Sequence, residues 1–301
     1  MLYKKILLTG VNGQVGHALK HVLLANTSFS DAFVALDRSQ LDLSRVDEIR
    51  RVVQTVQPDL IINPAAYTAV DKAETEPELA YAINVTAPQV LAEEAASIGA
   101  KLIQFSTDYV YNGKKSSPYL ETDATEPLSV YGKSKLAGED AIRAVGLPHL
   151  IFRTSWVYGA YGKNFLKTIL CLAGERDELR IVADQFGAPT SSHSIAEATL
   201  SVLTRWDGEA AGTYHLVNSG QTTWHGFATA IVEEYSRLQL SKAWSPLKVK
   251  AIQAITTQEF PTPAVRPANS CLDTSKLIQA FDVELPAWRD ALVEELKLLR
   301  I

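Results

Sequence analysis

Short apolar runs alternate with longer segments of helical spacing through the first half of the chain. The runs predict buried strands at Lys5–Thr9, Phe33–Leu36, Leu60–Asn63, Lys101–Ser106 and Leu150–Ser155. The spacing between them predicts helices at Gln14–Ala25, Val46–Val56, Pro77–Ile98 and Ser129–Val145. Strands that alternate with helices form parallel βαβ units, and right-handed crossovers make a doubly wound sheet the expected arrangement.

The alternation is looser in the second half. Here the pattern predicts helices at Asn164–Leu172, Ser194–Thr204, Trp224–Leu238 and Pro286–Leu299, with short strands at Leu179–Val182 and Thr213–Val217. Four prolines in Ser245–Asn269 indicate a loop-rich segment that wraps a ligand. We therefore expect an α/β fold with a second, smaller α/β domain packed on the first.

Composition and charge narrow the class of protein. The 301 residues are 47% hydrophobic and 21% charged, and the formal net charge is −5, which describes an ordinary globular chain long enough for a sizeable core. An acidic chain has no global attraction to polyanions, so we expect neither a nucleic-acid partner nor a polybasic membrane contact. Net charge does not exclude a local basic pocket for one small anion.

The cysteines and the chain start indicate a reducing compartment. Cys171 and Cys271 belong to no C-x-x-C or Cys/His cluster, so a disulfide framework and a cysteine zinc site are not expected. The apolar start ends at Gly10, short of the ~7–15 residues of a secretory core, and no run reaches the ~18 residues of a spanning helix. We expect a cytoplasmic protein.

A glycine turn follows the first expected strand and opens the first helix, in the order Gly10-Val11-Asn12-Gly13-Gln14-Val15-Gly16. The first glycine allows a tight turn, the second lets backbone approach a pyrophosphate, and the third permits close packing of helix on sheet. The N–H groups at the helix start then bind phosphate. The strand–turn–helix context favours a dinucleotide, although the spacing is G-x-x-G-x-x-G rather than the more common G-x-G-x-x-G.

Two charged residues end the second expected strand. Asp37 is placed to bind the adenosine ribose hydroxyls, as NAD requires, whereas Arg38 beside it suits the 2′-phosphate of NADP. The pair leaves NADH and NADPH both open. Asp42 and Leu43 follow at a position that edges the adenine ring.

Tyr131 and Lys135 are the strongest candidates for catalysis. They stand at i and i+4 at the start of a predicted helix, so both side chains emerge on one face. A phenol is a poor acid–base group near pH 7 unless a cation favours its phenolate. Lys135 supplies that charge and can bond the nicotinamide ribose, while Tyr131 donates a proton to a carbonyl oxygen. An exposed amphipathic face is the alternative, whereas a P-loop is excluded because Pro127 stands where its first glycine is needed.

Hydroxyl groups end the fourth expected strand, at Ser106 and Thr107. Ligands of open α/β sheets bind at the carboxyl ends of the strands. A hydroxyl there can bond a substrate carbonyl and stabilise the developing alkoxide. The glycine turn, Thr107 and the Tyr131 helix are all expected to open on this edge.

These features together resemble the extended short-chain dehydrogenase/reductases, and further segments resemble one family among them, the dTDP-4-dehydrorhamnose reductases. The matching segments are distributed over most of the chain: Asn63–Glu74, Ser106–Tyr111, Tyr131–Glu139, Phe152–Tyr158, Asp184–Thr190 and Pro261–Pro267. The resemblance implies a Rossmann-type cofactor domain mainly in residues 1–158 and a substrate-binding domain mainly in residues 159–301, with the two interleaved.

The resemblance also implies a reaction and a set of site residues. The reaction is reduction by NADPH or NADH of the 4-keto group of dTDP-4-dehydro-L-rhamnose to dTDP-L-rhamnose, a precursor of cell-surface polysaccharide. Tyr131 would be the proton donor, Lys135 its activator and Thr107 the group that stabilises the alkoxide. The implied cofactor residues are Gly10, Gly13, Gln14, Val15, Asp37, Asp42, Leu43, Ala66, Tyr67, Thr68, Tyr131 and Lys135. The implied substrate residues are Thr107, Asp108, Trp156, Asn164 and Arg266.

The chain departs from the family pattern in places. Some relatives form homodimers bridged by Mg²⁺ between carboxylates, one of which lies just after the glycine turn. Here His17-Ala18-Leu19 occupies that stretch, and His193 stands where a second acid is expected. Mg²⁺ prefers oxygen ligands, so we expect no metal site, while a homodimer stays open. Pro64 also removes a backbone donor near the cofactor.

Two other functions share many of these residues. A non-catalytic, cofactor-binding regulatory subunit should have lost part of the Thr107, Tyr131 and Lys135 set, yet this chain keeps all three. Another nucleotide-sugar reductase, or an epimerase or dehydratase, would use the same three residues. Consumption of the cofactor separates reduction from a reaction that recycles it.

Overall fold

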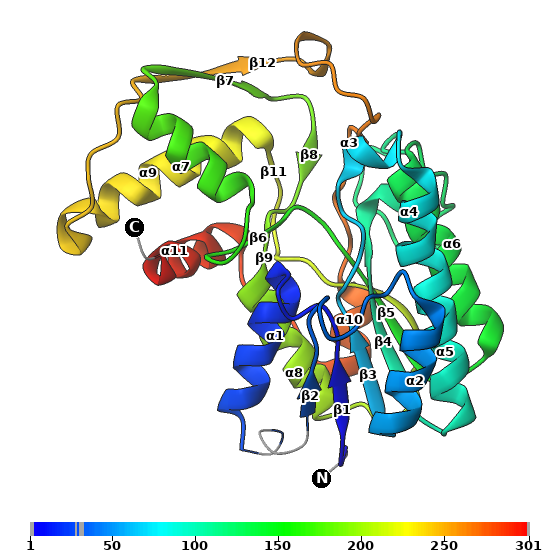
Figure 1. The fold of residues 1–301 in the computed structure, drawn as a ribbon. Helices are drawn as coiled ribbons and strands as arrows, with labels where there is room; N and C mark the ends of the chain where they lie inside the picture. The colour runs from blue at the N-terminus through cyan, green and yellow to red at the C-terminus, as the bar shows by residue number, and fades with distance from the viewer. Residues whose placement is uncertain (1–2, 28, 30–32, 300–301) are drawn as a thin grey trace.

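The computed structural model describes residues 3–27, 29 and 33–299 and contains an open sheet of six parallel strands (Figure 1). The strand order is β10-β5-β4-β3-β1-β2. The strands are β1 (Ile6–Leu8), β2 (Phe33–Ala35), β3 (Leu60–Asn63), β4 (Lys101–Thr107), β5 (His149–Thr154) and β10 (Gly212–His215). The predicted α/β fold with a doubly wound parallel sheet is confirmed, within a residue or two at each strand end.

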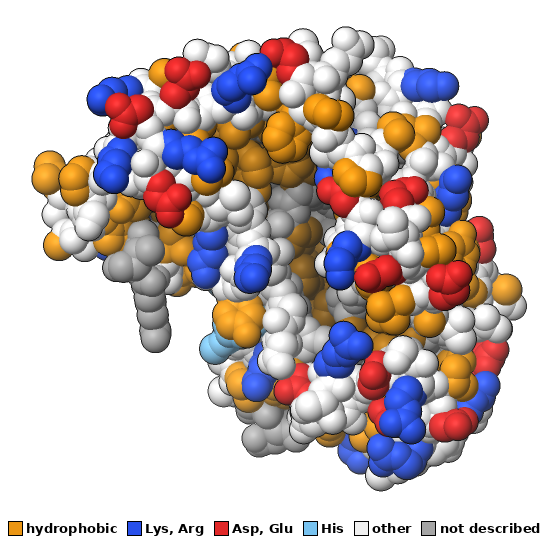
Figure 2. All heavy atoms as spheres, turned by 45° about the horizontal axis from the view of Figure 1, so that its top comes forward, with side chains coloured by type: hydrophobic (Ala, Val, Ile, Leu, Met, Phe, Trp, Pro, Cys, Tyr) orange, Lys and Arg blue, Asp and Glu red, His pale blue; other side chains and the backbone are white. Residues whose placement is uncertain are grey.

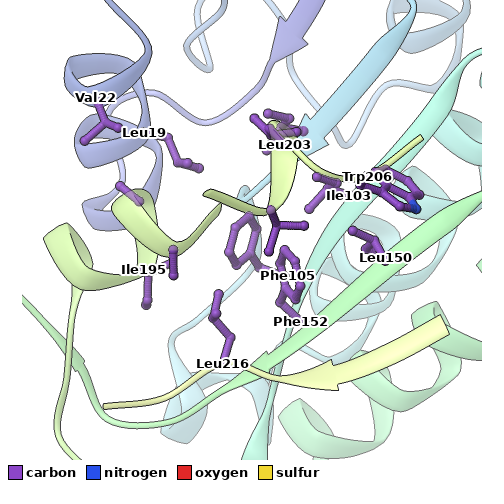
Figure 3. Packing of buried hydrophobic residues seen from close by; sticks show 14 of the residues in the cluster. Leu19, Val22, Ile103, Phe105, Leu150, Phe152, Ile195, Leu203, Trp206 and Leu216 are labelled. Carbon is purple, nitrogen blue, oxygen red and sulfur yellow. The ribbon is translucent and has the colours of Figure 1, made fainter. Parts of the chain in front are cut away.

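Helices cover both faces of this sheet, as its doubly apolar strands require. One face carries α1 (Gln14–Ala25), α8 (Ser192–Leu203) and α10 (Ser275–Phe281); the other carries α2 (Val46–Val56), α5 (Ala87–Ser97) and α6 (Val130–Val145). Within β1, Ile6 and Leu8 join the first cluster and Leu7 the second. Figure 3 shows the first cluster, where Leu19 of α1 and Ile195 of α8 lie over the strand residues.

The expected single helix at Pro77–Ile98 is wrong in its middle. The chain forms α4 (Pro77–Tyr81), then a π-helical turn η1 (Ala82–Thr86), and only then α5. The turn buries the Asn84 side chain, which accepts from the Tyr67 backbone N–H at 2.9 Å and donates to its carbonyl at 3.0 Å and to the Ser134 hydroxyl at 3.0 Å. These tertiary bonds stabilise a π turn that apolar spacing cannot reveal.

The second half builds a smaller layer above the sheet. Its helices α7 (Phe165–Glu175), α9 (Trp224–Lys242) and α11 (Trp288–Leu298) bury Ile169, Phe227 and Leu292 together. Three two-stranded pairs flank them: β7 (Glu178–Val182) with β12 (Ala251–Ile255), β8 (Phe186–Gly187) with β11 (Thr222–Thr223), and β6 (Val157–Tyr158) with β9 (Thr190–Ser191).

The expectation of a loop-rich Ser245–Asn269 missed β12, which pairs in parallel with β7. In β12 only Ile255 is buried and Ile252 half-buried, so the strand carries little apolar signal. The rest of the segment is irregular apart from the short η3 (Thr257–Glu259) and a β-bridge from Asn269 to Phe186.

The two halves of the chain share the large sheet. After β9 the chain returns to it through α8 and β10, and α10 later packs against β10. No helix in the described part of the chain is long and apolar enough to cross a membrane. The carboxyl ends of β1, β3, β4 and β5 face the smaller layer across a hollow that Figure 2 shows.

Candidate active site

A cavity of about 610 Å³ lies at the carboxyl edge of the large sheet. Its lining includes fourteen of the residues predicted for the site: Gly10, Gly13, Gln14, Val15, Asp42, Leu43, Ala66, Thr68, Thr107, Asp108, Tyr131, Lys135, Trp156 and Asn164. The other three predicted residues, Asp37, Tyr67 and Arg266, are not part of this lining. The structure therefore brings the glycine turn, the β4 end and the α6 start to one hollow.

The glycine turn forms a closely packed cradle. Gly10 has φ +58°, and a Cβ there would lie 2.7 Å from the Ala65 Cβ. A Cβ on Gly16 would lie 2.2 Å from the Gly10 carbonyl oxygen. Gly13 caps α1 without a side chain, and no acid stands in the first turn. N–H groups at a helix start whose first turn holds no acid suit a phosphate, so the residues present fit a dinucleotide.

Replacing Gly16 by alanine should lower both stability and cofactor affinity. The added methyl meets backbone, which cannot move aside cheaply, so we expect a loss of about 1–3 kcal/mol in the free energy of unfolding. Gly174→Ala is the matched control, because a Cβ there meets nothing within 4 Å inside α7, and alanine favours helix by about 1 kcal/mol. Urea unfolding measures the stability, and NADPH titration measures the cofactor affinity. Equal stability and equal affinity of Gly16→Ala and Gly174→Ala would contradict the packing argument.

The acid and the base that follow β2 have different surroundings. Asp37 accepts from the Ser39 hydroxyl at 2.6 Å and N–H at 2.8 Å and from the Asn12 amide at 3.2 Å. The Ser39 bonds, with smaller contributions from Asn12 and Gln40, lower the pKa of Asp37. Arg38, by contrast, lines the cavity. The cation, rather than the carboxylate, is therefore offered to a ligand in this conformation.

In the loop after β3, too, some of the predicted residues line the cavity and one does not. Ala66 and Thr68 line the cavity, whereas the Tyr67 phenol turns to Glu76 and donates to it at 2.5 Å. The Tyr67 backbone is held by Asn84 of the π turn. Tyr67 thus positions the loop through its main chain.

Tyr131 and Lys135 lie on the first turns of α6, deep in the cavity wall. Ser129 caps this helix by accepting from the Gly132 N–H at 3.1 Å. A Cβ on Gly132 would lie 2.2 Å from the Tyr109 carbonyl oxygen, so glycine lets α6 close onto the segment after β4. Tyr131 is 8% exposed and Lys135 is 4% exposed.

Burial shifts the pKa values of these two groups in opposite directions. Burial raises the pKa of Tyr131; a hydrogen bond with Thr107 opposes this and Asp108 adds to it. Burial lowers the pKa of Lys135 to about 8, against the attraction of Glu139. The Lys135 ammonium donates to the Phe105 carbonyl at 2.7 Å. Near pH 7 this cavity holds a neutral phenol that can donate and an ammonium close to its titration point.

The Thr107 hydroxyl stands at the end of β4 as expected. It donates to Asp108 Oδ1 at 3.0 Å and accepts from the Tyr109 N–H at 3.2 Å. The second Asp108 oxygen accepts from Ser270. Burial raises the pKa of Asp108 to about 6, although the Ser270 and Thr107 bonds oppose this shift.

The comparisons with known proteins extend over nearly the whole chain. The family model described as the RmlD substrate binding domain matches residues 4–301. The dTDP-4-dehydrorhamnose reductase of Burkholderia thailandensis is 47% identical over 95% of this chain and 96% of that protein. The chain belongs to the dTDP-4-dehydrorhamnose reductase family. The Escherichia coli K12 reductase is 46% identical, with 94% of each chain covered.

Solved structures of the family share the fold. The dTDP-4-dehydrorhamnose reductase of Bacillus anthracis, solved in complex with NADP, matches with a TM-score of 0.87 and 35% identity over 97% of this chain and 98% of its own. The ortholog from Clostridium acetobutylicum matches with a TM-score of 0.89 and 37% identity over 99% and 100%.

The other predicted substrate residues fall into two groups. Trp156, at φ +48°, lines the cavity and stacks on Trp224 at 3.6 Å between ring centroids. Asn164 caps α7 and donates to the Gln14 side chain at 3.0 Å, which joins the smaller layer to the glycine turn. Arg266 instead lines a second cavity of about 710 Å³ beside α7 and β7, and it is paired with Asp71.

Sequence reasoning missed a buried network behind the candidate catalytic groups. Glu139 accepts from the Ser106 hydroxyl at 2.5 Å and from Arg153 at 2.9 Å and 2.6 Å. Glu139 lies at i+4 from Lys135, which was an available signal, but its partner comes from β5. Lys163, Thr154 and Ser155 also line the cavity unpredicted. Among the described residues, Thr154 Oγ1 is the buried side-chain atom that lacks a hydrogen-bond partner, so a ligand could satisfy it.

His17 and His193, where the family resemblance leads one to expect carboxylates, belong to no metal-ligand cluster among the described residues. The His17 ring stacks on Tyr161 at 3.7 Å, and its Nε2 lies 3.2 Å from that of His21. His193 lies 3.9 Å from Glu197. Within residues 3–27, 29 and 33–299, no three His, Cys, Asp or Glu side chains are grouped to hold a metal ion.

The pH dependence of the reaction should report Lys135. Its lowered pKa means that the ammonium is lost as pH rises through about 8, so kcat/KM for the cofactor should fall about tenfold per unit above that value. Arginine keeps its charge far above pH 8. The kcat/KM of Lys135→Arg should therefore show no such fall above pH 8, whatever the rate of this variant at pH 7. An unchanged fall in that variant would assign the titration to another group.

Proposed function

We propose that this chain is an NAD(P)H-dependent dTDP-4-dehydrorhamnose reductase that converts dTDP-4-dehydro-L-rhamnose to dTDP-L-rhamnose. The observation that carries the proposal is the meeting of Thr107, Tyr131 and Lys135 in one cavity with the glycine turn. Relatives named dTDP-4-dehydrorhamnose reductase match over 94% or more of the chain. A regulatory subunit would have no reason to keep the three groups buried together.

We infer that the cofactor is held along the glycine turn, Asp42–Leu43 and the Ala66–Thr68 loop. Backbone N–H groups at the start of α1 would bind its diphosphate. Arg38 lines the same cavity and suits a 2′-phosphate, while Asp37 is engaged with Ser39, so we expect both cofactors to serve and NADPH to bind more tightly. The chemistry that a reduced nicotinamide supplies when bound is a hydride for the carbonyl carbon.

The side chains of this protein supply the proton and the orientation. Tyr131, kept neutral by burial, donates its phenolic proton to the 4-keto oxygen. Thr107 and Asp108 hold the substrate beside it; Thr107 turns its hydroxyl from Asp108 to the oxygen as negative charge develops there. The Lys135 ammonium then stabilises the phenolate that Tyr131 becomes.

We propose that the nucleotide end of the substrate extends toward the second cavity. Trp156 of the first cavity stacks on Trp224 of the second, so their shared wall is aromatic and suits a sugar ring. Arg266 and Arg180 offer positive charge along the second cavity. This division supports a cofactor unit mainly in residues 1–158 and a substrate unit mainly in residues 159–301.

The test is oxidation of NADPH and of NADH followed at the nicotinamide absorbance band, with enzymatically generated dTDP-4-dehydro-L-rhamnose. Stoichiometric oxidation with formation of dTDP-L-rhamnose supports the proposal. Turnover that leaves the cofactor unconsumed would identify an epimerase or dehydratase, and binding without turnover a regulatory subunit.

A cytoplasmic location and a homodimer are also part of the proposal. Cys171 is exposed and Cys271 buried, and both are free thiols, which suits a reducing compartment. Sedimentation measures whether the protein has the mass of a dimer. We expect the same mass with EDTA and with added Mg²⁺.

A further inference from the structure

The Asp71 carboxylate sits in a cradle of donors from the far end of the chain. Arg266 donates to its two oxygens at 3.1 Å and 2.8 Å, and the Ala264 backbone N–H donates at 3.2 Å. Asp71 belongs to α3 (Val70–Ala73), whereas its partners follow η3 nearly two hundred residues later. In Figure 1 this late segment descends to α3 from the smaller layer. The contact therefore ties the two halves of the chain together across the cleft.

This cradle adjoins both cavities. Val70, next to Asp71, lines the first cavity, and Arg266 lines the second together with Thr262 and Phe260. Tyr109 of the first cavity also interacts with Arg266. The contact between Asp71 and Arg266 therefore lies beside lining residues of both cavities.

The donor set is one that binds phosphate. A guanidinium fork together with a backbone N–H is a common anion site, and a carboxylate has the geometry to fill it in place of a phosphate. The pair is also accessible, since the side chains of Asp71 and Arg266 are 41% and 24% exposed. An ion pair open to water is weak and exchangeable.

We propose that Asp71 is an internal surrogate anion, which the diphosphate of the nucleotide-sugar substrate displaces from Arg266 and Ala264. Asp71 thereby sets substrate affinity, because each binding event must break its ion pair. The inference rests on the proposed function for the identity of the ligand. The opposite role, in which Asp71 only holds Arg266 in place for the substrate, predicts the opposite sign on binding.

The experiment is calorimetric titration of dTDP, dTMP and thymidine into the NADPH-loaded protein, for the wild type, Asp71→Asn, Arg266→Gln and the double variant. Asp71→Asn should bind dTDP about two- to fivefold more tightly, the range that a partly exposed ion pair corresponds to. Arg266→Gln should bind more weakly, and Asp71→Asn should bring no gain in that background. The gain should also vanish with thymidine, which has no phosphate.

Asp140→Asn is the matched control, since it breaks an ion pair with Arg143 on α6 and removes the same charge; its dTDP affinity should equal that of the wild type. Unchanged or weaker dTDP binding by Asp71→Asn would overturn the inference. Tighter dTDP binding by the double variant than by Arg266→Gln would also overturn it, because it would indicate only that the negative charge of Asp71 repels the ligand. In both cases reductase turnover by the wild type would leave the proposed function standing. Absence of both dTDP binding and turnover would instead reject the proposed function, and the inference with it.

Discussion

Tyr131→Phe should lower kcat by about 10² to 10⁴-fold, the usual contribution of a positioned proton donor. The phenol is buried and neutral in the cavity, so its removal deletes the proton source without changing the shape of the wall. NADPH affinity should stay close to that of the wild type, because the ring still packs against Tyr109. Steady-state rates with purified dTDP-4-dehydro-L-rhamnose and a separate NADPH fluorescence titration measure the two quantities.

Tyr81→Phe is the control for this substitution. Tyr81 ends α4 and is 40% exposed, so loss of its hydroxyl should leave kcat unchanged. Near-wild-type turnover by Tyr131→Phe would remove Tyr131 from the mechanism. A collapse of NADPH binding in that variant would show a structural role instead.

Glu139→Gln should cost about 3–5 kcal/mol in the free energy of unfolding, which is typical when one partner of a buried ion pair is removed. The Glu139 side chain is 1% exposed and that of Arg153 is 3% exposed. In the variant, the buried Arg153 guanidinium would face a neutral amide in place of the carboxylate. It would keep its hydrogen bond to the Tyr111 hydroxyl at 2.7 Å. Urea unfolding at pH 7 measures the difference.

The pH dependence supplies an independent check on the same residue. Burial by itself would raise the pKa of Glu139, but the Arg153 hydrogen bonds and charge lower it on balance. A carboxyl whose pKa is lowered by folding stabilises the protein above its unfolded pKa of about 4.3 and loses that contribution as pH falls. The gap between wild type and Glu139→Gln should therefore narrow below about pH 4.

Glu93→Gln is the control for charge loss. Glu93 pairs with Arg50 at 3.1 Å on the surface, where both side chains are more than one-third exposed. Such pairs contribute about 0–1 kcal/mol, so this variant should unfold near the wild-type midpoint. Equal losses of unfolding free energy in Glu139→Gln and Glu93→Gln would contradict the importance of the buried network.

The features that could be predicted from sequence are those encoded over short distances. Tyr131 and Lys135 share a helix face by spacing alone, and the cavity contains both. The glycine turn was predictable because its strand, turn and helix are contiguous. Each of these signals lies within one local element, so no knowledge of long-range packing was needed.

The features that escaped prediction depend on partners distant in sequence. The π turn at Ala82–Thr86 is held by bonds from Asn84 to Tyr67 and Ser134. The strand β12 exists because β7 offers it an edge. Arg266 carried the expected chemistry, yet its side chain is engaged by the distant Asp71. Asp37 and Tyr67 are instead engaged by the nearby Ser39 and Glu76, in a local conformation that residue spacing does not specify.

By itself, the sequence predicted the parallel α/β fold, and it pointed to the glycine turn, Thr107, Tyr131 and Lys135, which line one cavity. Apolar periodicity, turn chemistry and i,i+4 spacing act within a few residues and are written directly in the residue order. Only the tertiary structure decided which charges are buried, that Arg153 of β5 pairs with Glu139, and that Arg266 is held by Asp71. Burial and ion pairing depend on distances between segments far apart in the chain, and those distances exist only once the sheet and its covering layers have packed.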